Sequence, residues 1–179
     1  EGDYNIATDN PSYTGCGLVL GNGTSSTYST VNGIRLMGLN RGSSLGLTSD
    51  VNAVKGATRI KANGTVTKLI CVVGPVVNVW LEDLQLDGQS VGQRLVDWMH
   101  GATGGMNRVG MRNFSQWAVY MDTRVFTGSP NTSNWAFFSC SNHFTDVQIS
   151  EPSATTASAW YVGGQYDSGG GTRAASSNS

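Results

Sequence analysis

Charged side chains are scarce in this chain: they make up 13% of its 179 residues, and eleven basic against twelve acidic groups leave a net charge of −1. A nucleic-acid-binding surface needs clustered lysine and arginine to neutralise phosphates. The arginines here are scattered along the sequence, so we expect no nucleic-acid partner. Disordered proteins combine high net charge with few apolar residues, whereas 39% of this chain is hydrophobic. The composition therefore predicts a compact folded unit.

Long apolar runs are also missing. A membrane-spanning helix needs about 20 consecutive apolar residues, and the longest apolar stretch, Leu69 to Val79, is interrupted by Gly74, Pro75 and Asn78. We therefore expect no membrane span. Polarity comes from serine, threonine, asparagine, glutamine and glycine rather than from charge, a composition that favours an extracellular or virion-associated protein.

Potential metal ligands are few. The three cysteines (Cys16, Cys71 and Cys140) are odd in number and show no CxxC or zinc-type spacing. This pattern favours inert buried thiols over a disulfide framework. The two histidines are far apart and no aspartate-rich calcium loop occurs. We expect neither a metal site nor a cofactor.

The two ends of the sequence differ from its centre. No initiator methionine or signal peptide precedes the opening segment, which predicts a fragment of a longer chain. The last residues, Gly169 to Ser179, contain no apolar side chain larger than alanine. We therefore predict a folded segment over residues 1–164 and a flexible Gly/Ser-rich tail or linker over residues 165–179.

Short strand-like segments separated by turn residues run through the whole chain, and helical periodicity is nearly absent. This pattern predicts an all-β protein. The Asn-Gly dipeptides would suit the hairpins of a β-sandwich or jelly roll, so that architecture is kept as an alternative.

A repeated bend favours a different architecture. Three segments have apolar residues at alternate positions, then a single Asp83, Asn113 or Asp146, and then an apolar residue immediately after it. Both apolar neighbours can face inward only if the chain turns a corner there, and Asp and Asn tolerate the left-handed backbone that a corner needs. The three residues recur about every 30 residues. An earlier corner at Gly38 requires an insertion, which we place around Leu45 to Gly56.

This pattern resembles the right-handed parallel β-helix of the pectate-lyase-like superfamily, which includes polysaccharide lyases, glycoside hydrolases and phage tailspikes. The similar segments are Glu1 to Ile6, Gly33 to Asn40 and Val77 to Gly88, and the resemblance covers roughly residues 1–164. It implies a solenoid of stacked coils that recognises a surface polysaccharide, and in tailspikes such solenoids form homotrimers. The sequence lacks the family's Gly-His-Gly and Asn-Thr-Asp motifs.

Two functions therefore remain open. One is recognition of a polysaccharide, with cleavage by a lyase or glycoside-hydrolase reaction left undecided. The other is a non-enzymatic structural or adhesive virion protein that uses the β-helix as a rigid trimeric scaffold.

Candidate site residues follow from the strand pattern. A glycoside hydrolase needs two carboxylates some 5–9.5 Å apart, and neighbouring strands are about 4.8 Å apart. Asp97 and Asp122 are the best candidate catalytic pair, although strand aspartates can also be solvated charges. Aromatic residues stack on sugar rings and arginines bind their polar groups, unless they fill a subunit interface. The predicted substrate-binding residues are Trp80, Arg94, Trp117, Tyr120 and Arg124.

Overall fold

The computed structural model describes residues 2–22, 29–40, 57–122, 141–166 and 172–174. This part of the chain contains twelve strands and no helix, which confirms the predicted all-β class. Accordingly, no helix that could cross a membrane occurs in it. The strands are β1 (Gly2–Ile6), β2 (Cys16–Leu20), β3 (Arg35–Met37), β4 (Thr58–Ala62), β5 (Lys68–Val77), β6 (Trp80–Asp87), β7 (Arg94–Ala102), β8 (Gly105–Arg112), β9 (Trp117–Asp122), β10 (His143–Ile149), β11 (Ser158–Tyr166) and β12 (Thr172–Ala174).

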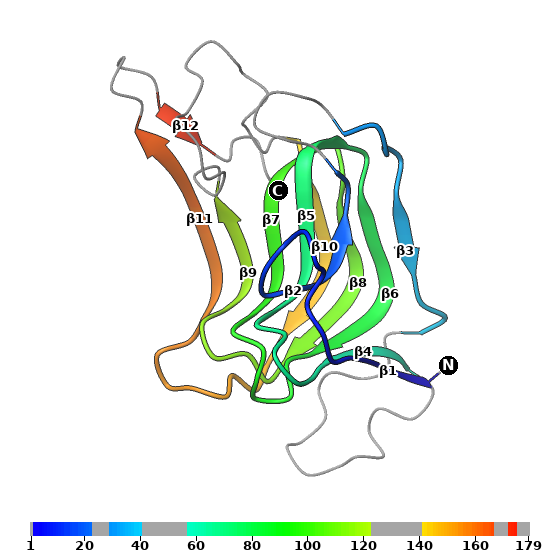
Figure 1. Ribbon diagram of the computed structural model, residues 1–179, viewed down its shortest axis with the longest axis vertical. Coiled ribbons are helices and arrows are strands. Elements are labelled where there is room, and N and C mark those ends of the chain that lie inside the picture. Colours follow the sequence, from blue (N-terminus) through cyan, green and yellow to red (C-terminus); the bar gives the residue numbers. More distant parts are fainter. Residues whose placement is uncertain (1, 23–28, 41–56, 123–140, 167–171, 175–179) are drawn as a thin grey trace.

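The strands form two six-stranded sheets, between which the chain passes back and forth (Figure 1). The first sheet has the order β1-β4-β6-β8-β10, with β3 also paired to β6, and the second has the order β12-β11-β9-β7-β5-β2. All strand pairs in the described ranges are parallel except β11 with β12. Parallel neighbours cannot be joined by tight hairpins, so the described parallel pairs do not have the hairpin connections expected of the sandwich alternative.

The end of the folded segment lies later than predicted. The proposed boundary between residues 164 and 165 falls inside β11, and β12 comes from the predicted tail. Antiparallel pairing with β12 satisfies the backbone of β11 from Gly164 to Tyr166. A short tail segment without large apolar side chains can therefore still pair with the sheet through its backbone.

The core lies between the two sheets and consists of aligned rows. In the first sheet, Ile60, Leu86 and Met111 are paired in succession, and in the second sheet Trp98 is paired with Met121. These residues belong to one buried hydrophobic cluster. Burying each such side chain contributes about 1.5–3 kcal/mol, so the rows supply the main stabilising term.

The predicted corner residues adopt left-handed backbone angles, with φ of 53° at Asp83, 57° at Asn113 and 51° at Asp146. Their equivalence, however, is only partly right. Glu82 and Thr145 both pair with Asn107, so the residue between Asp83 and Asp146 in the row is Arg108, with φ of 53°.

Asn113 lies just after the end of β8, in a different corner from Arg108. Its backbone N–H donates to the carbonyl of Glu151 at 2.8 Å, and Glu151 has a φ of 51°. The predicted single row of corners is therefore wrong. Strands β8 and β10 each have one bend within the strand, at Arg108 and Asp146, and a second bend just after it, at Asn113 and Glu151.

The earliest predicted corner is aligned correctly but built differently. Met37 pairs with Glu82, which places Gly38 opposite Asp83. Unlike Asp83, however, Gly38 does not have a positive φ. The next pair on β6 is Arg59 with Gln85. Glu82 and Gln85 are close together in sequence, whereas their partners Met37 and Arg59 are separated by a much longer stretch of chain. The chain thus contains an insertion at this corner, and the segment predicted for it, 45–56, lies outside the described residues.

A disulfide joins Cys16 and Cys71, whose Cα atoms are 6.0 Å apart, so the expectation of free thiols is wrong for these two residues. Both sulfurs lie on the outer side of the second sheet, in a small buried cluster with Val73 and Met99. The partners are 55 residues apart in sequence, and only the pairing of β2 with β5 brings them together. Cys140 lies outside the described residues.

The corners can be tested by substitution at Asp146. A β-branched residue in the left-handed region costs about 1–2 kcal/mol, whereas glycine adopts it freely. We expect Asp146→Val to lower the free energy of unfolding in urea by about that amount and Asp146→Gly to change it much less. Equal losses in the two variants would show that the backbone angle is not the cause.

The disulfide should stabilise the fold. Closing a loop of this length contributes about 4 kcal/mol in the chain-entropy estimate. We expect the double variant Cys16→Ser, Cys71→Ser to unfold at a markedly lower urea concentration than the oxidised wild type, and dithiothreitol present during unfolding to move the wild type to the same midpoint. A wild-type midpoint that is insensitive to dithiothreitol, with all three cysteines titrating as free thiols, would contradict the bond.

Candidate functional site

A group of aromatic and charged side chains gathers on the outer side of the second sheet. Strands β5, β7 and β9 share one local pattern, in which two consecutive buried residues separate two outward ones. Leu95 and Val96, for example, are buried between Arg94 and Asp97. Parallel register then aligns the outward residues from strand to strand. We call the resulting cluster the aromatic–cation face; it contains Lys68, Arg94, Asp97, Trp117, Tyr120 and Tyr161.

Asp97 lies at the bottom of this face. Its side chain has no exposed surface, and its Oδ2 is 3.2 Å from Arg94 Nη1 and 3.5 Å from Lys68 Nζ. Burial raises the pKa of the Asp97 carboxyl above its ordinary value, and the charges of Arg94 and Lys68 offset part of this effect. A carboxylate enclosed in this way cannot meet a substrate while both cations stay in place.

Arg94 lies over the aromatic side chains. Its guanidinium carbon is 3.7 Å from the centre of the Tyr120 ring and 5.1 Å from that of Trp117, a cation–π arrangement. Its Nε donates to Gln116 Oε1 at 3.4 Å. One fifth of the Arg94 side chain is exposed, so it is both anchored and accessible.

The three aromatic rings form a continuous platform. Tyr120 and Tyr161 are stacked, with centroids 4.6 Å apart and planes inclined by 8°, and Trp117 lies 5.0 Å from the first ring and 5.5 Å from the second. Trp117 and Tyr161 are partly exposed. Within the described ranges, Trp117 Nε1 and Arg94 Nη2 donate no hydrogen bond, so two donors border an apolar surface.

Several predicted site residues therefore meet. Arg94, Asp97, Trp117 and Tyr120 are in contact, and the predicted inward orientation of their neighbours is confirmed because Val96, Trp98, Val119 and Met121 are all buried. Lys68 and Tyr161 were missed. The strand register would have identified them, because Lys68 on β5 pairs with Arg94 and Tyr161 on β11 pairs with Tyr120.

The remaining predicted residues do not join this contact network. Trp80 faces outward as predicted but belongs to the first sheet, where its indole N–H donates to Asn78 Oδ1 at 2.8 Å. Asp122 ends β9, where its backbone pairs with Gly163, and its side chain is outside the description. Arg124 lies outside the described residues. The proposed pairing of Asp97 with Asp122 therefore stays a prediction.

The first sheet carries a ladder of ion pairs on its outer side. Arg59 binds Asp3 at 2.7 Å and lowers the pKa of that carboxyl to about 2. Burial opposes ionisation of Asp87, but hydrogen bonds from Asn113 and from the Gln89 backbone N–H, with the charge of Arg112, lower its pKa overall. The buried carboxylate is therefore fully compensated, which is the pattern of a structural network.

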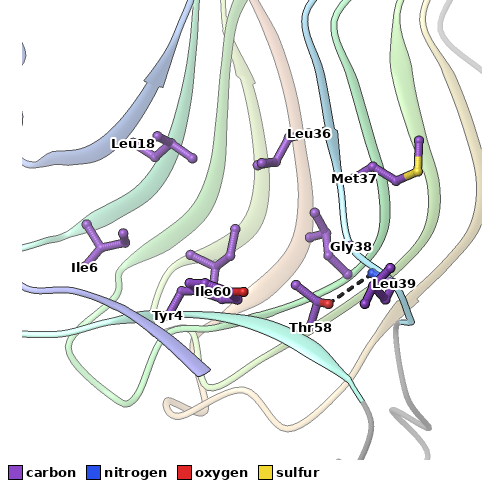
Figure 2. Close-up of a pocket in the computed structure, with 10 residues that line it drawn as sticks. Tyr4, Ile6, Leu18, Leu36, Met37, Gly38, Leu39, Thr58 and Ile60 are labelled. Atoms are coloured by element: carbon purple, nitrogen blue, oxygen red, sulfur yellow. Dashed lines mark hydrogen bonds between the residues drawn. The ribbon is translucent and has the colours of Figure 1, made fainter. Parts of the chain in front are cut away.

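An apolar hollow of about 340 Å³ lies where the first strands of the two sheets leave the core incompletely covered. Figure 2 shows Ile6, Leu18, Leu36 and Ile60 around it. The hydroxyl of Thr58, which also lines it, already accepts a hydrogen bond from the Leu39 N–H at 3.0 Å. Ligand sites combine apolar walls with a few convergent polar groups, whereas the side-chain polar groups lining this hollow are the hydroxyls of Thr58 and Tyr4, with no charged side chain. The aromatic–cation face is the better candidate.

Comparisons with family models, with curated proteins and with solved structures give no match. The function of the chain therefore has to follow from its residues and their geometry.

The ladder on the first sheet contains one uncompensated group. Gln85 is buried and neither its Oε1 nor its Nε2 has a hydrogen-bond partner in the described part of the chain. An unsatisfied buried polar group costs about 1–3 kcal/mol. We expect the nearly isosteric Gln85→Met variant to unfold at a higher temperature than the wild type. Gln148→Met, in the same row but less buried, is the control and should show no gain; destabilisation by Gln85→Met would mean that the amide is satisfied in solution.

Proposed function

We propose that this chain is a right-handed parallel β-helix segment of a tailspike-like or secreted carbohydrate-active protein, and that its aromatic–cation face binds a polysaccharide. The alternation of strands between two parallel sheets and the left-handed corners support the β-helix interpretation. The single observation that supports glycan binding is the ring platform of Trp117, Tyr120 and Tyr161 beside the guanidinium of Arg94.

The chemistry of the face matches that of a sugar. The apolar side of a pyranose ring can lie on Trp117 or Tyr161, while its hydroxyl oxygens accept hydrogen bonds from Arg94 Nη2 and Trp117 Nε1. Aromatic side chains with a polar edge suit a ligand of this mixed character. The face spans β7, β9 and β11, about 4.8 Å apart, so an extended glycan that crosses the strands would meet a contact on each.

The disulfide supports the proposed location. Disulfides persist in oxidising environments and are rare in the cytosol. A buried Cys16–Cys71 bond is therefore in keeping with an extracellular or virion-associated protein, as the polar, weakly charged composition also suggests.

Binding without cleavage is the role that the face supports best. Hydrolysis requires a carboxyl group that reaches the glycosidic oxygen, and Asp97 is enclosed by Arg94 and Lys68. A lyase or hydrolase reaction would need a different acid or base, so we propose recognition as the function of these residues.

A non-enzymatic scaffold is the second candidate. On β11, Trp160 and Val162 are 37% and 55% exposed, although they continue rows that are buried on the other strands. Contiguous exposed apolar side chains often mark an interface. This observation favours a structural or adhesive virion protein whose copies, in a homotrimer, would cover such surfaces.

Substitution of the platform tests glycan binding. We expect Trp117→Ala and Tyr161→Ala each to weaken the affinity for a bound glycan at least about tenfold, or 1.4 kcal/mol, because each removes a stacking surface. Calorimetry against a panel of capsular and O-antigen polysaccharides would identify that glycan. The same mixtures can be examined for new reducing ends and 4,5-unsaturated ends, which would reveal cleavage.

Trp80→Ala is the matched control, since it removes a partly exposed tryptophan from the other sheet. Its affinity should equal that of the wild type. Equal losses in all three variants, or wild-type affinity in both platform variants, would rule out this face. If no polysaccharide binds and the chain forms trimers through β11, the scaffold function is the correct one.

A further inference from the structure

We infer that Asp97 is a positioning residue: its ionised carboxylate holds Arg94 over the Tyr120 ring, and uptake of one proton releases that arginine. The functional consequence of this coupling between Asp97 and Arg94 rests on the proposed glycan-binding role, in which Arg94 contacts the glycan. The coupling itself is a property of the protein alone and can be measured without a glycan.

The surroundings of Asp97 leave few groups that could act in its place. From β5, Lys68 faces it at 3.5 Å and Cys71 lies beside it in the register, locked in the disulfide. From β9, Tyr120 is its register partner. On its own strand, Arg94 is the charged neighbour. Asp97 is therefore the acidic group at the centre of this cluster, and we assign to it the proton whose uptake releases Arg94.

Arg94 depends on this carboxylate for its orientation. Its Nη1 donates to both carboxylate oxygens of Asp97, at 3.4 and 3.2 Å. Its other hydrogen-bond partner in the described residues is Gln116, a neutral acceptor at 3.4 Å. Bonds to an ionised acceptor are about twice as strong as neutral ones. When Asp97 becomes neutral, the ionic restraint on the guanidinium is lost, and the side chain can leave the Tyr120 ring for solvent.

Burial sets the direction of the switch. It raises the pKa of Asp97, so the carboxyl takes up its proton at a higher pH than a surface aspartate does. The folded chain binds this proton more tightly than the unfolded chain, so the stability that the group contributes is present at low pH and is lost as pH rises through the folded-state pKa. Protonation therefore releases Arg94 without unfolding the protein at this site.

Release of Arg94 should weaken a bound glycan. A guanidinium that is already in place loses little conformational entropy on binding, whereas a mobile one must be ordered first. The affinity of the face should therefore fall several-fold as Asp97 becomes protonated, which makes the face sensitive to mild acid.

The test follows the Nε–Hε signal of Arg94 by NMR in the intact, oxidised chain, with the signal assigned through Arg94→Lys. At neutral pH we expect a ring-current-shifted resonance, because the group lies over Tyr120. As the pH is lowered from neutral to mildly acidic values, the signal should move toward the position of a free arginine, with the same midpoint as the carboxyl carbon of Asp97. Asp97→Asn should show the released position at every pH.

Arg112 provides an internal control. Its Nε donates to Asp87 at 3.0 Å, and the pKa of that carboxyl is lowered, so the Arg112 signal should stay constant over the same range. Lys68→Met should shift the midpoint of the pH-dependent Arg94 signal to higher pH, because it removes one cation that favours the ionised form of Asp97.

Two results would overturn the inference: an Arg94 signal that does not move with pH in the wild type, or one that titrates equally in Asp97→Asn. If the variant fails to fold, the shared midpoint of Arg94 and the Asp97 carboxyl carbon in the wild type still decides the matter. Failure of every glycan to bind, with Arg94 titrating as expected, would refute the proposed function and leave the positioning role intact.

Discussion

Parallel, in-register pairing is the constraint on which the rest of this structure depends. Each position on a strand faces the equivalent position on the next strand, so a side chain suited to one strand must be suited to all of them. Inward rows such as Ile60, Leu86 and Met111 are therefore uniformly apolar. Outward rows gather whatever polar or aromatic residues the strands carry, and the aromatic–cation face is one such row with its neighbours.

The sequence was sufficient to predict the fold class and the orientation of most strand residues. Alternation identified the strands, and an aspartate followed at once by an apolar residue marked two of the corners correctly, at Asp83 and Asp146. Arg108 was missed because arginine has no preference for left-handed backbone, and its place is set by the row in which it stands, where its guanidinium binds Asp83. Asn113 was assigned to the wrong row of corners because two successive corners can show the same local sequence pattern, an Asp or Asn followed by an apolar residue.

The candidate site was predictable in its residues and not in its contacts. The alternation of inward and outward side chains along a strand indicated that Asp97 and Trp117 face outward, which is confirmed. It could not indicate that Arg94 and Lys68 close over Asp97, because that depends on the strand register and on side-chain reach. An outward aspartate that looked accessible is therefore fully buried. The disulfide was hidden for the same reason, since only the pairing of β2 with β5 brings Cys16 and Cys71 into contact.

The corner between Met37 and Arg59 shows how such a chain can diversify. Pairing with β6 resumes after the added sequence as if nothing had intervened, because a bend fixes only the strand ends and not the path between them. New material of any length can thus be accommodated at a corner while the hydrophobic rows on either side keep their alignment. Evolution, or a protein engineer grafting a peptide, can vary the decoration at these points separately from the scaffold.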